Sequence, residues 1–172
     1  MVAPWYEDLN VGDVVRSRTG RTVLDVDNVW FTALTHNTNQ IHFNAEYARE
    51  RGFDRLVVDS TLTLALVTGL SVEDFSERTH ANLGWDEVKL PAPVFAGDTL
   101  WALSEVLAKR ESRSHPDMGI VTVRTRGVNQ RDETVIEFER TFMLPRRPGG
   151  AGSPEPPESA GGGPAGAEAG RT

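Results

Sequence analysis

The sequence contains no cysteine, and this absence excludes three kinds of chemistry at once. Disulfide bonds, thiolate metal sites and cysteine nucleophiles all need a sulfhydryl group. Long hydrophobic runs are missing too, because no apolar stretch approaches the roughly 20 residues that span a bilayer. The first residues, MVAPWYEDLNVGD, lack the basic segment and apolar run of a secretory signal. We therefore expect a cytoplasmic protein with no membrane partner.

Concentrated positive charge is also absent. The formal net charge is −7, and no helix or stripe gathers Lys and Arg on one face, which argues against nucleic acid as a partner. No histidine pair has helical metal-ligand spacing together with a third ligand, so no metal site is expected. A Gly-rich phosphate loop and a nucleophilic serine motif are missing as well. These absences leave chemistry that uses ordinary polar side chains.

The most unusual stretch is FTALTHNTNQIHFNAEYA, residues 31–48, which is rich in side chains able to transfer or orient protons. Its candidate residues are His36, Asn37, Asn39 and His42. The pattern predicts a helix over residues 29–35 with Asp27 or Asn28 as its cap, a polar loop, and a further helix capped by Asn44. Polar loop residues between packed elements are typical positions for catalytic groups.

A second helix pattern begins after Asp59, where leucines, alanine and valine follow one another closely. Asp59 is expected to cap this helix, and Gly69 with Ser71 to end it. Because the helix is apolar on almost every side, we expect other structure to surround it.

The remaining sequence favours strands separated by turn residues. Short extended pieces are predicted at 11–15 and 22–26, and a buried strand or approach segment at 56–58. Longer strands are predicted at 81–90, 99–112, 119–129 and 134–144. A long antiparallel sheet with one buried helix indicates an α+β fold, with the sheet wrapped around the helix. This domain is expected over residues 1–147. Residues 148–172, nearly all Gly, Pro, Ala, Ser and Glu, are expected to form a disordered tail.

The loop resembles the signature of the MaoC-like and R-specific enoyl-CoA hydratases, which reads Gly-Asp-x-Asn-Pro-hydrophobic-His-x-Asp. Residues 36–44 occupy the positions of this signature. The resemblance places His42 at the catalytic histidine of the family and Asn39 at its asparagine. Asn37 replaces the catalytic aspartate of the family, and an amide cannot transfer a proton as a carboxylate does. The resemblance covers residues 6–146.

The segments VDSTLTLALVTG (58–69) and ANLGWDEVKLP (81–91) are similar to the mesaconyl-CoA hydratase branch, also called β-methylmalyl-CoA dehydratase. This resemblance implies a hotdog fold, an acyl-CoA thioester substrate and no cofactor, since coenzyme A is part of the substrate. Known members of the branch often hold two hotdog units in one chain, whereas this sequence has one. We therefore expect a homodimer or higher homo-oligomer, which also covers the open sheet edge.

Hydration of a 2-enoyl thioester needs a base for water, an acid for the α-carbon and stabilisation of the enolate oxygen. His42 is the candidate base, because imidazole exchanges protons near neutral pH. Three groups can compensate for the amide of Asn37: His42 acting twice, His36, or Asp59. Asn39 is expected to fix the loop or the water.

The start of the central helix is the candidate substrate-binding site. The free N–H groups near Ser60 and Thr61, with the positive end of the helix dipole, suit a thioester oxygen that gains negative charge. Asp59 at the mouth of this helix belongs to the same site, although capping alone also explains it.

Three functions remain open from the sequence. The leading one is a hydro-lyase acting on a short branched 2-enoyl-CoA, with mesaconyl-CoA and β-methylmalyl-CoA as the expected pair. An acyl-CoA thioesterase on the same fold is the second, because that chemistry uses a carboxylate near the helix, such as Asp59. A non-catalytic hotdog subunit that binds acyl-CoA is the third, and Asn37 favours it. Fold alone does not choose among them.

Overall fold

Alternation of apolar and polar residues produces four long strands in the second half of the chain. The computed structural model describes residues 3–149. Its strands are β1 (Val14–Arg16), β2 (Arg21–Thr22), β3 (Ala81–Lys89), β4 (Thr99–Glu111), β5 (Met118–Val128) and β6 (Thr134–Pro145). Its α-helices are α1 (Asp25–Thr35), α2 (Ala45–Glu50) and α3 (Ser60–Leu70). Short helical turns occur at η1 (Tyr6–Asp8), η2 (Gln40–His42) and η3 (Val72–Ser76).

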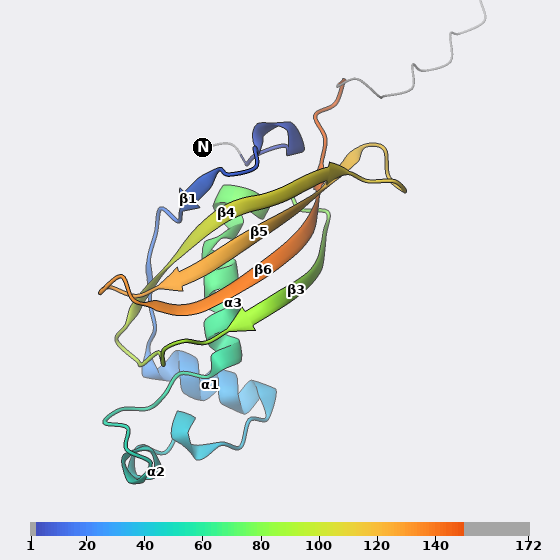
Figure 1. Ribbon diagram of the computed structural model, residues 1–172. Coiled ribbons are helices and arrows are strands. Elements are labelled where there is room, and N and C mark those ends of the chain that lie inside the picture. The colour runs from blue at the N-terminus through green and yellow to red at the C-terminus, as the bar shows by residue number, and fades with distance from the viewer. Residues whose placement is uncertain (1–2, 150–172) are drawn as a thin grey trace, which may run out of the picture.

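The strands form one six-stranded sheet in the order β1-β4-β5-β6-β3, with β2 also paired to β4. Every pairing is antiparallel. The sheet curves around α3, while α1 and α2 lie beyond one end of the sheet, with α1 next to the first turn of α3 (Figure 1). This is the hotdog arrangement that the sequence predicts.

The core lies between α3 and the inner face of the sheet. Val67 of α3 and Phe138 of β6 are both fully buried there, and burial of such side chains contributes roughly 1.5–3 kcal/mol each. Gly127 of β5 permits this close packing, because a Cβ atom at that position would lie 2.6 Å from Cγ2 of Val67. The helix is thus fixed against the sheet along its inward face.

The structure confirms the four long strands, with boundaries that differ from the predicted ones by a residue or so at each end. Asn44 caps α2 by accepting from Tyr47 N–H, and Asp59 caps α3. Both cap predictions are therefore confirmed. The predicted tail falls mostly outside the described residues, which end at Gly149.

Other local predictions were wrong. Helix α1 begins at Asp25, so residues 25 and 26 are helical rather than extended. Asp27 lies in the first turn and accepts from Leu24 N–H, whereas Asn28 is a buried residue inside the helix and not its cap. Of the two alternatives for residues 56–58, the strand is wrong and the approach segment fits, because the only ladder contact of the segment within residues 3–149 is an isolated bridge between Val57 and Phe95.

The central helix matches its prediction in part. Ser71 is the C-cap of α3, as predicted, whereas Gly69 lies within the helix. The helix is not surrounded in the single chain, because Thr61, Ala65 and Gly69 are exposed along one face.

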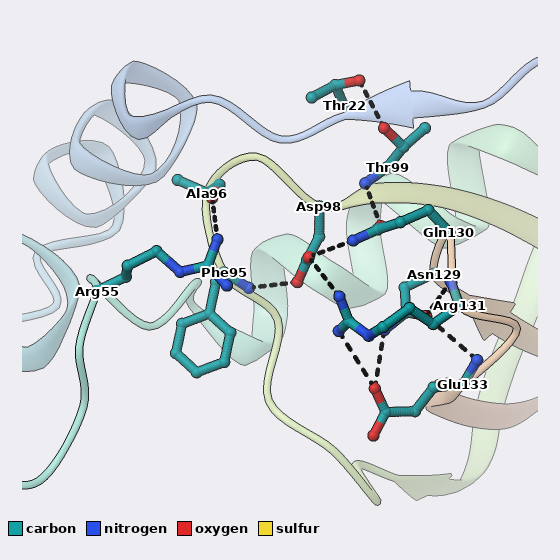
Figure 2. Close-up of polar contacts among 10 residues, drawn as sticks. All are labelled: Thr22, Arg55, Phe95, Ala96, Asp98, Thr99, Asn129, Gln130, Arg131 and Glu133. Carbon is teal, nitrogen blue, oxygen red and sulfur yellow. Dashed lines mark hydrogen bonds and ion pairs between the residues drawn. The ribbon is translucent and has the colours of Figure 1, made fainter.

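A buried aspartate connects two loops at one end of the sheet (Figure 2). Asp98, 1% exposed, accepts hydrogen bonds from Phe95 N–H at 3.0 Å and from Gln130 Nε2 at 2.8 Å. Arg131 supplies a positive charge at 3.6 Å. These bonds join the β3–β4 loop to the β5–β6 turn. The same β3–β4 loop supports the segment before α3, since Val58 N–H donates to the Val94 carbonyl at 2.8 Å.

We expect Asp98→Ala to lower the free energy of unfolding by about 2–3 kcal/mol, because buried donors lose their acceptor. Denaturant titration followed by circular dichroism measures the change. The matched control is Asp54→Ala at an exposed position, which is expected to stay within about 0.5 kcal/mol of the natural sequence. Equal stability of the two variants would show that the Asp98 contacts contribute little.

Candidate active site

The candidate loop starts where α1 ends. His36 adopts a left-handed conformation with φ of 56°, and its N–H donates to the Thr32 carbonyl. Asn37 N–H donates to the same carbonyl at 2.9 Å. This arrangement ends the helix and turns the chain toward α3. The His36 side chain is exposed, and within residues 3–149 it forms no hydrogen bond to another candidate residue.

The next turn, η2, carries His42. The Asn39 side-chain oxygen accepts from Ile41 N–H at 3.3 Å, so Asn39 caps this turn. His42 is 8% exposed, and its Nδ1 lies 2.7 Å from the Val57 carbonyl oxygen. Because a carbonyl can only accept, Nδ1 carries the hydrogen. The other ring nitrogen, Nε2, is therefore the one able to take a proton.

Asn37 connects this loop to the start of α3. Its side-chain oxygen accepts from Asn39 N–H at 3.0 Å, and its amide Nδ2 donates to Asp59 Oδ2 at 2.6 Å. The two partners define which atom is oxygen and which is nitrogen. Asn37 thus acts as a bridge between the loop and a buried carboxylate.

Asp59 is 3% exposed and receives hydrogen bonds on both oxygens. Its Oδ1 accepts from Thr61 N–H at 2.7 Å, from the Thr61 hydroxyl at 2.5 Å and from Leu62 N–H at 3.3 Å. Burial alone raises the pKa of this carboxyl, but the bonds from Thr61, Asn37 and the backbone outweigh burial and hold the pKa below its ordinary value. Asp59 is therefore a carboxylate at neutral pH.

The hydrogen bonds to Asp59 determine which backbone N–H group at the start of α3 is available to a substrate oxygen. Thr61 N–H, expected to be free, is used by Asp59. Ser60 N–H has no hydrogen-bond partner among residues 3–149, and the Ser60 side chain is exposed. Ser60 also lines a largely apolar cavity of about 240 Å³, between residues 57–63 and the loop 90–94. Of the two predicted N–H groups, Ser60 supplies the available one.

A second cavity, of about 400 Å³, lies beside the second half of α1 and the start of the loop. His36 and Asn37 both line it, together with Val29 and Phe43. The structure therefore places the two side chains at one surface depression, while His42 lies deeper, against Val57.

Asn28 is a residue of the site that was expected only as a possible helix cap. Its side chain, fully buried, reaches the His42 carbonyl, the Val57 carbonyl and Asp59 N–H. Its spacing could have indicated a buried position, because Asn28 and Thr32 lie four residues apart, on one face of α1. A polar residue on the inward face of a helix needs buried partners.

Neither a metal site nor a membrane span was found in the part of the chain that the structure describes. No three His, Asp or Glu side chains between residues 3 and 149 are grouped so that they could hold a metal ion. No helix in that range has the length and apolar character needed to cross a bilayer.

Comparison with known proteins identifies a family for this chain. Residues 3–167 match the family model described as mesaconyl-CoA hydratase. The mesaconyl-CoA hydratase of Cereibacter sphaeroides is 36% identical over 159 residues, which are 91% of this chain and 46% of that protein. The β-methylmalyl-CoA dehydratase of Chloroflexus aurantiacus is 33% identical, with 88% of this chain and 43% of that protein aligned. This chain spans less than half the length of either relative.

A solved structure agrees with these relatives. The crystal structure of a MaoC domain protein from Chloroflexus aurantiacus superposes with a TM-score of 0.81 at 33% identity, covering 89% of this chain and 43% of that chain. The matched residues of the family model include the loop, α3 and the whole sheet. This chain belongs to the mesaconyl-CoA hydratase family.

Proposed function

We propose that this protein is a hydro-lyase that reversibly hydrates a short branched 2-enoyl-CoA, with mesaconyl-CoA and β-methylmalyl-CoA as the substrate pair. The observation that carries the proposal is the orientation of His42, whose Nδ1 faces the Val57 carbonyl at 2.7 Å and leaves Nε2 as a base. Family membership supports the acyl-CoA substrate. The free N–H of Ser60 at the start of α3 supplies a donor for the thioester oxygen.

The reaction then follows from these groups. His42 Nε2 takes a proton from water, and the hydroxide oxygen adds to the β-carbon. The electrons of the double bond move to the thioester oxygen, where Ser60 N–H and the α3 dipole stabilise the enolate. The imidazolium of His42 returns the proton to the α-carbon. One group performs both transfers, so the amide of Asn37 need not donate a proton.

The other two compensating groups fit this chemistry less well. Asp59 is an anion whose oxygens already accept four hydrogen bonds, so it has no proton to give. His36 is exposed at the helix end. The engaged carboxylate of Asp59 also argues against the thioesterase, which needs a carboxylate free to act on water or substrate.

Purified protein incubated with mesaconyl-CoA and with crotonyl-CoA tests the proposal. Loss of enoyl absorbance without free thiol is the expected result. Release of free thiol would instead indicate a thioesterase, and no change with either compound would favour the acyl-CoA-binding subunit.

We expect His42→Ala to lower the hydration rate by about a hundredfold or more, because the proton-transferring group is lost. Circular dichroism checks that the variant is folded. His115→Ala, which changes an exposed histidine in the β4–β5 turn, is the control and is expected to keep the natural rate. A folded His42→Ala protein with a near-natural rate would mean that His42 is structural.

Asn37→Asp is expected to slow hydration of mesaconyl-CoA by about tenfold or more, since a cost of about 1.4 kcal/mol already gives tenfold. The new carboxylate would stand where an amide now lies 2.6 Å from Asp59 Oδ2, and like charges repel strongly in a poorly solvated site. Rates on mesaconyl-CoA and crotonyl-CoA measure the effect.

The double variant Asn37→Asp with Asp59→Asn is the matched control for Asn37→Asp. It keeps one amide and one carboxylate in contact, and asparagine also caps helices. We expect it to recover most of the lost rate. If Asn37→Asp alone strongly accelerates hydration of both compounds, the natural protein is better described as a non-catalytic subunit.

We further propose that the protein works as a homodimer in which α3 and β3 face the second copy. Ser60, Thr61, Ala65 and Gly69 leave one face of α3 exposed. Strand β3 is an edge strand with exposed Leu83 and Trp85 (49% and 45%). Unpaired edges and adjacent apolar surface are typical of interfaces. The relatives, at twice the length or more, have room for a second unit.

Gly69→Arg is expected to convert the dimer to monomer. A Cβ atom at Gly69 meets nothing within 4 Å in the single chain, so the variant should fold, while a long charged side chain blocks a second helix. Light scattering at micromolar concentration measures the mass, and Ala108→Arg at an exposed position of β4 is the control. A natural protein that is monomeric and fully active would contradict the assembly.

A further inference from the structure

Asn28 occupies the fourth position of α1 and is fully buried. Its Nδ2 donates to the His42 carbonyl at 2.8 Å and to the Val57 carbonyl at 3.0 Å, and its Oδ1 accepts from Asp59 N–H at 2.9 Å. The orientation of the amide is unambiguous, because the reversed one would place an oxygen against two carbonyl oxygens. One side chain thus connects α1 to two other segments, the η2 turn 14 residues away and the segment before α3, 29 to 31 residues away.

The donating side of Asn28 acts on the base. The Val57 carbonyl that accepts from Asn28 is the same one that accepts from His42 Nδ1 at 2.7 Å. Asn28 also holds the backbone carbonyl of His42 itself. Both the main chain of His42 and the acceptor that selects its tautomer are therefore fixed by one amide group.

The accepting side of Asn28 acts on the substrate-binding end of α3. Asp59 N–H, which Asn28 holds, immediately precedes Ser60, whose N–H is the available donor. Asn28 is therefore one of the contacts that set the distance between the base and the oxyanion donor. The η2 turn and the segment before α3 also share a backbone bond from Val57 N–H to the Ile41 carbonyl at 3.1 Å, and Asn37 joins the loop to Asp59 at 2.6 Å.

We propose that Asn28 is a positioning residue that holds the His42 ring, in its Nδ1–H tautomer, in register with the start of α3. The inference rests on the proposed hydratase function for its kinetic consequence but not for its structural one. The competing reading is a buried polar residue that serves only stability. A positioning role predicts a loss of kcat beyond that caused by an equally destabilising substitution elsewhere. A purely structural role predicts a loss of stability without such a loss of kcat.

Asn129 provides a matched control. It is also fully buried and makes three side-chain hydrogen bonds, all to residues within four positions of itself in the β5–β6 turn. Asn28→Ala and Asn129→Ala are therefore compared for unfolding midpoint, kcat and KM on mesaconyl-CoA. Asn28→Asp is the near-isosteric variant, which keeps the volume and an acceptor but replaces the donor.

We expect Asn28→Ala to lower kcat by about a hundredfold, the effect of a misplacement of about 1 Å, with KM changed less than about threefold because the acyl-CoA surface is intact. Asn129→Ala should destabilise similarly and keep kcat. Asn28→Asp should lose at least as much rate as Asn28→Ala, since a carboxylate faces two carbonyl oxygens. Equal kcat values for the Asn28→Ala and Asn129→Ala proteins would overturn the proposal.

Nitrogen-15 NMR of the His42 ring supplies a readout that needs no substrate. The natural protein and Asn129→Ala should show the Nδ1–H tautomer, and Asn28→Ala a mixture of tautomers. If the mixture appears while the natural protein hydrates neither thioester, the hydratase function fails and the positioning role stands. If the tautomer is unchanged in Asn28→Ala, the positioning role is wrong.

Discussion

The buried charge of Asp59 is the constraint on which the site depends. A carboxylate that is 3% exposed is stable only if donors replace the water that it has lost. The first turn of α3 supplies backbone N–H groups, Thr61 adds its hydroxyl, and Asn37 donates from the loop. Thr61 and Asn37 therefore supply the hydrogen-bond donors that the buried Asp59 carboxylate requires.

This constraint also gives a physical reason for an amide at position 37. Two ionised carboxylates cannot share a contact of 2.6 Å, so one of them would have to stay protonated. With Asp59 already serving as the helix cap, an amide at position 37 satisfies the anion and keeps the loop closed. Asn37 and Asp59 are better understood as one unit than as a lost acid beside a cap.

Patterns within a few residues were enough to predict most of the fold. Strands β3 to β6 follow from alternation, and the caps Asn44 and Asp59 from local hydrogen bonding, which depends only on neighbouring residues. The start of α1 was missed because Asp27 reaches back to the Leu24 backbone from inside the helix. The segment 56–58 is apolar like a strand, but it has no neighbouring strand along its length beyond one bridge.

The candidate site was predicted in residue types but not in connections. Asn37, Asn39 and His42 were identified from loop composition and resemblance, and the structure gives the latter two their partners in Ile41 and Val57. Asn28 was expected only as one of two possible caps, with Asp27, because its actual partners lie 14 to 31 residues away and no local pattern reveals such contacts. Hydrogen bonds between residues far apart in sequence are the part of a site that a single sequence does not predict.

The proposed dimer interface and the proposed oxyanion donor both lie on α3. Ser60, the proposed oxyanion donor, lines the apolar cavity, and its side chain lies on the exposed face of α3. Hydrogen bonds to a developing oxyanion are far stronger where water is excluded. A second hotdog unit over α3 would remove that water, so covering the helix and completing the catalytic environment are one event.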